Sequence, residues 1–191
     1  MLKTKDEALS AFKKIKVSAE MEVDLKMKAL RTDRGGEFTS KEFSKYCEGL
    51  EIKRFLTTPY SPQQNGVVER RNQTIMAMAT TLLKSKNVPG TFWGEAVLTP
   101  VYLLNRAPTW SVVRKTPYEA RYHKKLRVQH LSTFGCVPHL RTVNTYLKKL
   151  VDRSTPMVFF GYEPASKAYR VYDPKTRKLH VRQDVIFDKE K

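Results

Sequence analysis

The spacing of apolar residues changes near residue 124, and this change most strongly limits the folds that the chain can adopt. Before it, apolar side chains recur mainly at helical intervals, with two short strand-like runs between them. After it, short runs of β type follow one another, separated by turn residues. We therefore predict an α/β domain over residues 1–123, with a sheet that looks too small for its helices, and a small all-β barrel over residues 124–191.

The N-terminal part is expected to alternate helices with short strands. Thr4 and Glu7 have the spacing of a capping box that opens the first helix, and Thr39 and Glu42 repeat this spacing before the second helix. The polar, turn-rich residues 63–66 predict a loop before a long helix. The other expected elements are a strand that ends near Thr32, a strand over 52–56, the long helix over 67–86, a helix over 93–104 and a short helix that starts at Thr116-Pro117.

The C-terminal part contains four short runs that are typical of strands. They cover residues 134–137, 157–162, 168–172 and 178–187. Residues 173–176, Asp-Pro-Lys-Thr, lie between the last two runs and predict a hairpin turn.

The charge of the chain points to a polyanionic partner. Lys and Arg number 36 against 19 Asp and Glu, which gives a formal net charge of +17, and the excess is densest over residues 124–191. A folded chain with such an excess most often binds nucleic acid. A generic basic surface is the alternative.

Composition also excludes several classes of protein. The sequence has no run of about 18 apolar residues, so no membrane-spanning helix is expected. Its first residues lack an apolar segment, so no secretory signal is expected either. Cys47 and Cys136 are the only cysteines, which excludes a disulfide scaffold and a cysteine-rich zinc module. We expect neither a membrane nor a small molecule as partner.

Two carboxylates lie at positions where α/β folds usually carry catalytic residues. Asp33 follows a predicted strand, and Glu69 lies in the first turn of the long helix, with 35 residues between them. Together they could hold a divalent metal ion against a phosphodiester, and Mg²⁺ fits because it prefers oxygen ligands. Two simpler roles stay open: Asp33 could form the turn before Gly35, and Glu69 could stabilise the helix N-terminus.

The residues around these carboxylates resemble integrases of copia-type retrotransposons. Residues 30–38, Leu-Arg-Thr-Asp-Arg-Gly-Gly-Glu-Phe, are similar to the second catalytic Asp motif of that family, and residues 58–72 are similar to its catalytic Glu motif. The 35-residue gap matches the D,D-35-E class. The resemblance continues through residues 92–96, 102–106 and 116–120, and then through 130–136 and 161–174, which resemble the SH3-like module that follows the integrase core.

This resemblance implies a fold and a function. Residues 1–123 would be a truncated ribonuclease-H-like integrase core and residues 124–191 an SH3-like barrel. Asp33 and Glu69 would be catalytic and would bind Mg²⁺ or Mn²⁺. The nucleic-acid contacts would come from residues beside the two carboxylates and in the loop before the long helix: Arg34, Gln64, Asn65, Arg70 and Arg71.

The resemblance also implies the setting of the protein. The partner would be double-stranded DNA, the parent Pol polyprotein would integrate DNA as a homo-oligomer, and the location would be the nucleus.

One element of the family pattern has no counterpart in this sequence. The first catalytic Asp should stand on a strand before the first predicted helix, and neither Asp6 nor Asp24 has a suitable position. We therefore expect weak or no catalysis by this chain alone, as for a decayed element or a truncated gene model. A non-catalytic nucleic-acid-binding protein is the alternative. A ribonuclease-H-like nuclease unrelated to transposition would leave the C-terminal module unexplained.

Overall fold

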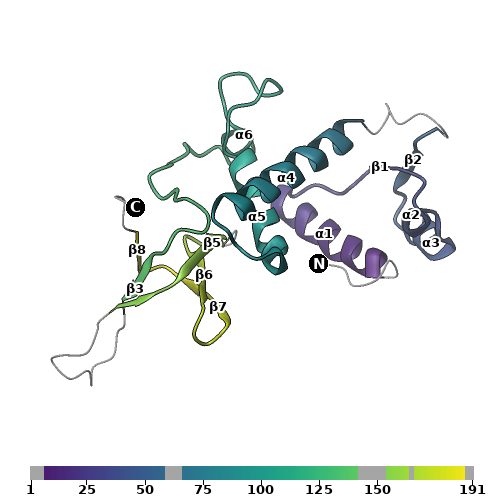
Figure 1. Ribbon diagram of the computed structural model, residues 1–191. Coiled ribbons are helices and arrows are strands. Elements are labelled where there is room, and N and C mark those ends of the chain that lie inside the picture. The colour runs from purple at the N-terminus through teal and green to yellow at the C-terminus, as the bar shows by residue number, and fades with distance from the viewer. Residues whose placement is uncertain (1–6, 59–65, 142–153, 164–165, 188–191) are drawn as a thin grey trace. The chain divides into compact units, whose positions relative to one another are not determined.

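The computed structural model describes residues 7–58, 66–141, 154–163 and 166–187 (Figure 1). The chain divides into two compact units, Met1–Asn72 and Gln73–Lys191. Its mixture of helices and strands confirms the predicted α/β class, and the small sheets near the C-terminus are consistent with the predicted SH3-like module. The domain boundary expected near residue 124 falls inside the second unit, and as a boundary between domains it stays a prediction.

The first unit places three helices and two strands along the chain. They are α1 (Ala8–Val23), β1 (Ala29–Thr32), α2 (Gly36–Thr39), α3 (Lys41–Gly49) and β2 (Lys53–Leu56). The two strands pair in parallel, with Ala29 opposite Lys53 and Thr32 opposite Leu56. Within the described residues this sheet has two strands, so it is as small as the sequence suggested.

The core of the first unit forms on the apolar face of α3. Phe43 and Cys47, one helical turn apart, are fully buried and belong to one core cluster with the buried Ile52. Phe12 from α1 packs against Phe43, with 5.0 Å between the ring centroids. Leu50 continues the same apolar spacing but follows the end of the helix, and its side chain is 45% exposed.

The start of α3 differs from the expectation. Ser40, not Thr39, is the N-cap: its hydroxyl accepts the N–H of Phe43 at 3.2 Å. Thr39 instead ends the short helix α2, and its hydroxyl donates to the carbonyl of Gly35 at 3.2 Å. The extended backbone that a cap needs occurs one residue later because α2 occupies the positions before it. The other expected capping residue, Thr4, lies outside the described residues.

The helices that follow agree with the predicted ranges. They are α4 (Gly66–Ser85), whose first residues belong to the first unit, the 3₁₀ turn η3 (Gly90–Phe92), α5 (Trp93–Leu104) and α6 (Pro117–Tyr122). A capping box starts α6, since Glu119 N–H donates to the hydroxyl of Thr116 and Thr116 N–H donates to Glu119. None of the helices in the described part of the chain is long and apolar enough to cross a membrane.

Two small antiparallel sheets complete the second unit. One has the order β4-β3-β8 and the other β5-β6-β7, and Figure 1 shows β6 and β7 as a hairpin. The strands are β3 (His139–Arg141), β4 (Ser154–Pro156), β5 (Val158–Tyr162), β6 (Tyr169–Asp173), β7 (Lys178–Arg182) and β8 (Val185–Ile186). The predicted hairpin turn is confirmed: the Asp173 carboxylate accepts from Lys175 N–H and from the Thr176 hydroxyl, both at 2.8 Å.

The strand expected over residues 134–137 is not formed. Gly135 has a φ of 78°, which no regular strand residue adopts, and Pro138 has no N–H to donate. The segment still bonds to β5, since Gly135 N–H donates to Phe159 and Phe159 N–H donates to Cys136. It therefore lies beside the sheet without continuing a regular ladder.

Neighbouring residues of β5 bury their side chains in two different cores. Phe160 packs with Ala79 of α4 and Ala96 of α5. Phe159 packs with Val171 of β6 on the other side. Successive side chains of a strand point to opposite faces, so β5 joins the helices to the C-terminal sheets in one compact unit.

Candidate functional site

Asp33 lies directly after β1, as predicted, and its side chain is exposed. One carboxylate oxygen, Oδ1, accepts the N–H of Gly35 at 3.1 Å. A Cβ on Gly35 would stand 3.1 Å from this oxygen, so glycine permits the close approach. Asp33 therefore forms the turn that the sequence offered as its simpler role, and its Oδ2 has no hydrogen bond from any described residue.

Arg34 joins the ends of the two parallel strands. Its Nε donates to the carbonyl of Thr57 at 2.9 Å, and Thr57 N–H donates to the carbonyl of Thr32 at 3.1 Å. No described residue takes a hydrogen bond from the two terminal nitrogens of the Arg34 guanidinium. The side chain is exposed, so these nitrogens are available to a phosphate beside Asp33.

Glu69 lies in the first turn of α4, and its side chain is exposed. Arg70 and Arg71 follow it and are exposed as well, with the Arg70 guanidinium folded back toward Gly66. In this position the negative charge of Glu69 stabilises the N-terminus of α4, which is the simpler of its two possible roles. Gln64 and Asn65, two expected nucleic-acid contacts, lie outside the described residues.

A complete metal centre is not formed by the residues that the structure describes. Within the described ranges, no three His, Cys, Asp or Glu side chains gather in a group that could hold a metal ion. Carboxylate oxygens are suitable ligands for Mg²⁺, but Asp33 and Glu69 would supply only part of a coordination shell. The roles of both residues in catalysis and metal binding stay predictions.

Sequence reasoning missed a second candidate site, which lies wholly within the second unit. A pocket of about 770 Å³ opens between the end of α5, the segment after α6 and the β5–β6 connection. Tyr102 lines it from α5, Arg106 from the turn after α5, Tyr162 and Tyr169 from the strands, and His130 from the segment between. The spacing of Tyr102 and Arg106 by four residues was visible in the sequence, but nothing there placed them beside residues that follow Tyr102 by 28 to 67 positions.

The aromatic floor of this pocket is held in place by stacking and hydrogen bonds. The ring of Tyr102 stacks on Tyr162 with 4.2 Å between centroids, and the Arg106 guanidinium carbon lies 3.4 Å from the Tyr102 ring centre. The Tyr102 hydroxyl bonds to Nε2 of His130 at 2.7 Å. Burial raises the pKa of Tyr162 to about 12, so its hydroxyl stays protonated and donates to the carbonyl of Ser132 at 3.1 Å.

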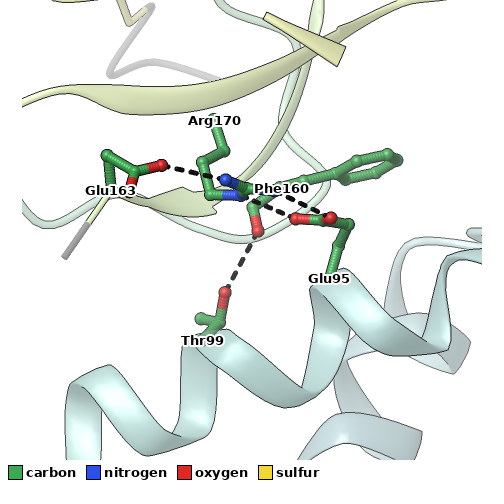
Figure 2. Close-up of polar contacts among 5 residues, drawn as sticks. All are labelled: Glu95, Thr99, Phe160, Glu163 and Arg170. Atoms are coloured by element: carbon green, nitrogen blue, oxygen red, sulfur yellow. Dashed lines mark hydrogen bonds and ion pairs between the residues drawn. The ribbon is translucent and has the colours of Figure 1, made fainter. Parts of the chain in front are cut away.

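An ion-paired cluster fixes the two walls of the pocket to each other. Figure 2 shows Arg170 of β6 between Glu95 of α5 and Glu163, with Thr99 beneath Phe160. The Thr99 hydroxyl donates to the carbonyl of Phe160 at 3.2 Å, and both groups are buried. The helix that carries Tyr102 is therefore bonded to the strands that carry Tyr162 and Tyr169.

Two family models match parts of the chain. Residues 135–191 match the retroviral polymerase SH3-like domain. Residues 1–85 match the TnsB C-terminal domain.

Among solved structures, the chain is similar to the simian T-cell lymphotropic virus intasome in complex with PP2A regulatory subunit B56 gamma. The TM-score is 0.47 at 18% identity, over 97% of this chain and 64% of the other. It is also similar to the HTLV-2 integrase catalytic core domain in complex with magnesium, in its trimeric form. Here the TM-score is 0.45 at 25% identity, over 62% of this chain and 70% of the other.

Curated relatives match nearly the whole chain. The retrovirus-related Pol polyprotein from transposon TNT 1-94 of Nicotiana tabacum is 39% identical over 98% of this chain. The retrovirus-related Pol polyprotein from transposon RE2 of Arabidopsis thaliana is 32% identical over 98% of it. The chain spans 14% and 13% of the length of these two relatives. It is therefore a homologue, over one segment, of the family of retrovirus-related Pol polyproteins from copia-like transposons.

Proposed function

We propose that this chain is a segment of a retrotransposon integrase in which Asp33 and Glu69 are two of the carboxylates that bind divalent metal ions. The parent protein would process DNA ends and join them to target DNA. One observation carries the proposal: in a homologue of Pol polyproteins, two exposed carboxylates with 35 residues between them stand at a strand end and in a first helical turn. Each is followed by an exposed arginine suited to a phosphate.

We also propose that the chain alone has little or no catalytic activity. The support is the composition of the site, since two carboxylates leave most of the coordination places of Mg²⁺ or Mn²⁺ to water. Incubating the chain with a labelled duplex end and Mg²⁺ or Mn²⁺ should give no more joined or nicked product than the Asp33→Asn variant. A metal-dependent product that disappears in Asp33→Asn would contradict the inactivity and support the catalytic role.

Metal binding is tested without any catalysis. Titration calorimetry with Mn²⁺ should show weak binding that both Asp33→Asn and Glu69→Gln remove. Asp24→Asn is the matched control, because Asp24 is also exposed and lies shortly before β1. If the three variants bind Mn²⁺ like the original chain, neither carboxylate holds the metal.

A non-catalytic nucleic-acid-binding protein is the second candidate function, and the net charge of +17 favours it. Binding to duplex DNA should then weaken steeply with salt, because neutralising phosphates releases counterions. Asp33→Asn should leave this binding unchanged. A flat salt dependence between low and physiological ionic strength would contradict the electrostatic contact.

The remaining expectations belong to the same proposal. Double-stranded DNA is the proposed partner, the parent integrase would act as a homo-oligomer, and the proposed location is the nucleus. Self-association is measured by analytical ultracentrifugation, and location by imaging a tagged chain in cells.

A further inference from the structure

The pocket of the second unit combines an aromatic lining with an excess of cations. Arg106, Lys124, Arg127 and Lys167 line it, and no carboxylate among the described residues forms an ion pair with any of them. Glu163 is the one acidic residue among the described residues of its wall, and it bonds to Arg170 at 2.9 Å. Like charges gathered around one hollow repel each other, and an anion bound there would relieve this repulsion.

Arg106 is held in a fixed orientation against two tyrosine rings of the pocket. Its guanidinium covers the Tyr102 ring and lies 4.6 Å from the Tyr118 ring centre. Its Nη1 donates to the backbone carbonyl of Tyr102 at 3.2 Å, so the cation is oriented before any ligand arrives. A fixed guanidinium among tyrosine rings suits a ligand that is both flat and anionic.

The size and shape of the pocket narrow the ligand class. Its volume of about 770 Å³ lies within the roughly 300–1,000 Å³ typical of sites that enclose small ligands. A base within a duplex is stacked between its neighbours, so only an unpaired or extruded nucleotide can enter such a hollow. Aromatic side chains beside a basic rim are the usual means of holding unpaired bases and their backbone.

We propose that this pocket binds an unpaired nucleotide of a nucleic-acid strand. The base would lie against the tyrosine and arginine lining, and Lys124, Arg127 and Lys167 would pair with the phosphates on either side. The proposal does not depend on metal binding by Asp33 and Glu69, because every residue that it uses lies in the second unit. The site would give the chain a preference for frayed or single-stranded ends over an intact duplex.

The test compares two triple variants of the full chain with the same change of charge. The pocket variant carries Lys124→Gln, Arg127→Gln and Lys167→Gln. The control variant carries Lys175→Gln, Arg177→Gln and Lys178→Gln, three exposed residues that do not line the pocket. Fluorescence anisotropy at physiological salt measures binding to a labelled twelve-residue oligothymidine and to a duplex of equal length. Circular dichroism checks that both variants are folded.

The pocket variant should bind the single strand roughly tenfold more weakly than the control variant, because about three phosphate contacts are lost. Its affinity for the duplex should fall no further than that of the control. If both variants lose affinity equally, for the single strand and for the duplex, the proposal is overturned, because net charge alone would then explain the binding. Thymidine monophosphate that binds as tightly as the oligonucleotide would also overturn it, because the pocket would then hold a free nucleotide.

A second variant tests the aromatic part of the pocket. Tyr118→Leu keeps an apolar side chain but removes the ring beside Arg106. It should lower the affinity for the single strand several-fold and leave the duplex affinity unchanged. An unchanged preference for the single strand would contradict a role of the aromatic lining. Every residue changed in this assay lies in the second unit, so its outcome is separate from the Mn²⁺ titration that tests Asp33 and Glu69.

Discussion

Arg170 donates Nε and Nη2 to the two carboxylate oxygens of Glu95, at 2.7 and 2.9 Å, across a sequence separation of 75 residues. This two-point contact fixes α5 to the first residues of β6 (Figure 2). Both side chains are mostly buried, with 19% and 23% of their surface exposed, so solvent screens the pair only in part. The helix and the C-terminal sheets are therefore held together by a charged contact as well as by packed phenylalanines.

Removing the negative charge of this contact should destabilise the second unit. Glu95→Gln leaves the Arg170 cation partly buried beside a neutral amide, which costs about 1–3 kcal/mol of unfolding free energy. Urea denaturation followed by tryptophan fluorescence measures the loss. Glu163→Gln is the comparison and should cost less, because Glu163 accepts a single hydrogen bond from Arg170. Equal unfolding midpoints for Glu95→Gln and the original chain would show that packing alone holds the helix.

Gly161 allows β5 to pass close to α5. Its φ of 128° is rarely adopted by other residues, and a Cβ there would stand 2.5 Å from Oγ1 of Thr99. Gly161→Ala should therefore lower the unfolding free energy by about 2–4 kcal/mol, from backbone strain and overlap together.

A double variant separates these two causes. Thr99→Ala alone removes the hydrogen bond to Phe160 and should cost about 1 kcal/mol. In the double variant the hydroxyl that overlaps with the new Cβ is absent. The double variant should therefore lose less unfolding free energy than the sum of the two single losses. Strict additivity in chemical denaturation would assign the whole effect of Gly161→Ala to its backbone conformation.

The sequence predicted most elements of this fold because their apolar periodicity is strong. The helix predicted over 93–104 has these bounds in the structure, and α4 begins and ends within one residue of the predicted helix. Asp33 and Glu69 also stand at the strand end and the first helical turn that the sequence indicated. Their catalytic roles stay predictions, because a metal centre needs further ligands and the described residues bring no third one to either carboxylate.

The errors and omissions have physical reasons. Residues 134–137 look like a strand, but Gly135 turns the backbone out of the extended region. The pocket was not foreseen because it draws on three separate segments, which meet only when Arg170 and Thr99 join α5 to β5 and β6. His130 belongs to the same group of segments, since its half-buried ring bonds to the Tyr102 hydroxyl.

The corrected cap of α3 can be tested by paired substitutions. Ser40→Ala removes the acceptor of the Phe43 N–H and should cost about 1 kcal/mol. Thr39→Ala should cost less, because its hydroxyl only donates to carbonyls of the preceding turn. Hydrogen exchange of peptides that cover residues 41–49 measures the local effect. Faster exchange in Thr39→Ala than in Ser40→Ala would restore the cap that the sequence suggested.

His130 should make the stability of the second unit depend on pH. Burial, and secondly the nearby charge of Arg106, hold the pKa of its imidazole below the usual value, so the folded state favours the neutral ring. The unfolded chain binds the proton more readily, with a pKa of about 6.5, so stability is full above this pH and decreases as the pH falls through it.

The measurement is the unfolding free energy at several pH values from about 7.5 down to about 5, on either side of the unfolded pKa. His130→Gln keeps a polar group beside the Tyr102 hydroxyl but cannot take up a proton in this range, so its stability should fall less over the same interval. His139→Gln is the matched control, because His139 is exposed, and it should behave like the original chain. If His130→Gln loses as much stability on acidification as the original chain, the pH dependence arises at other groups and the Tyr102–His130 bond does not sense the proton.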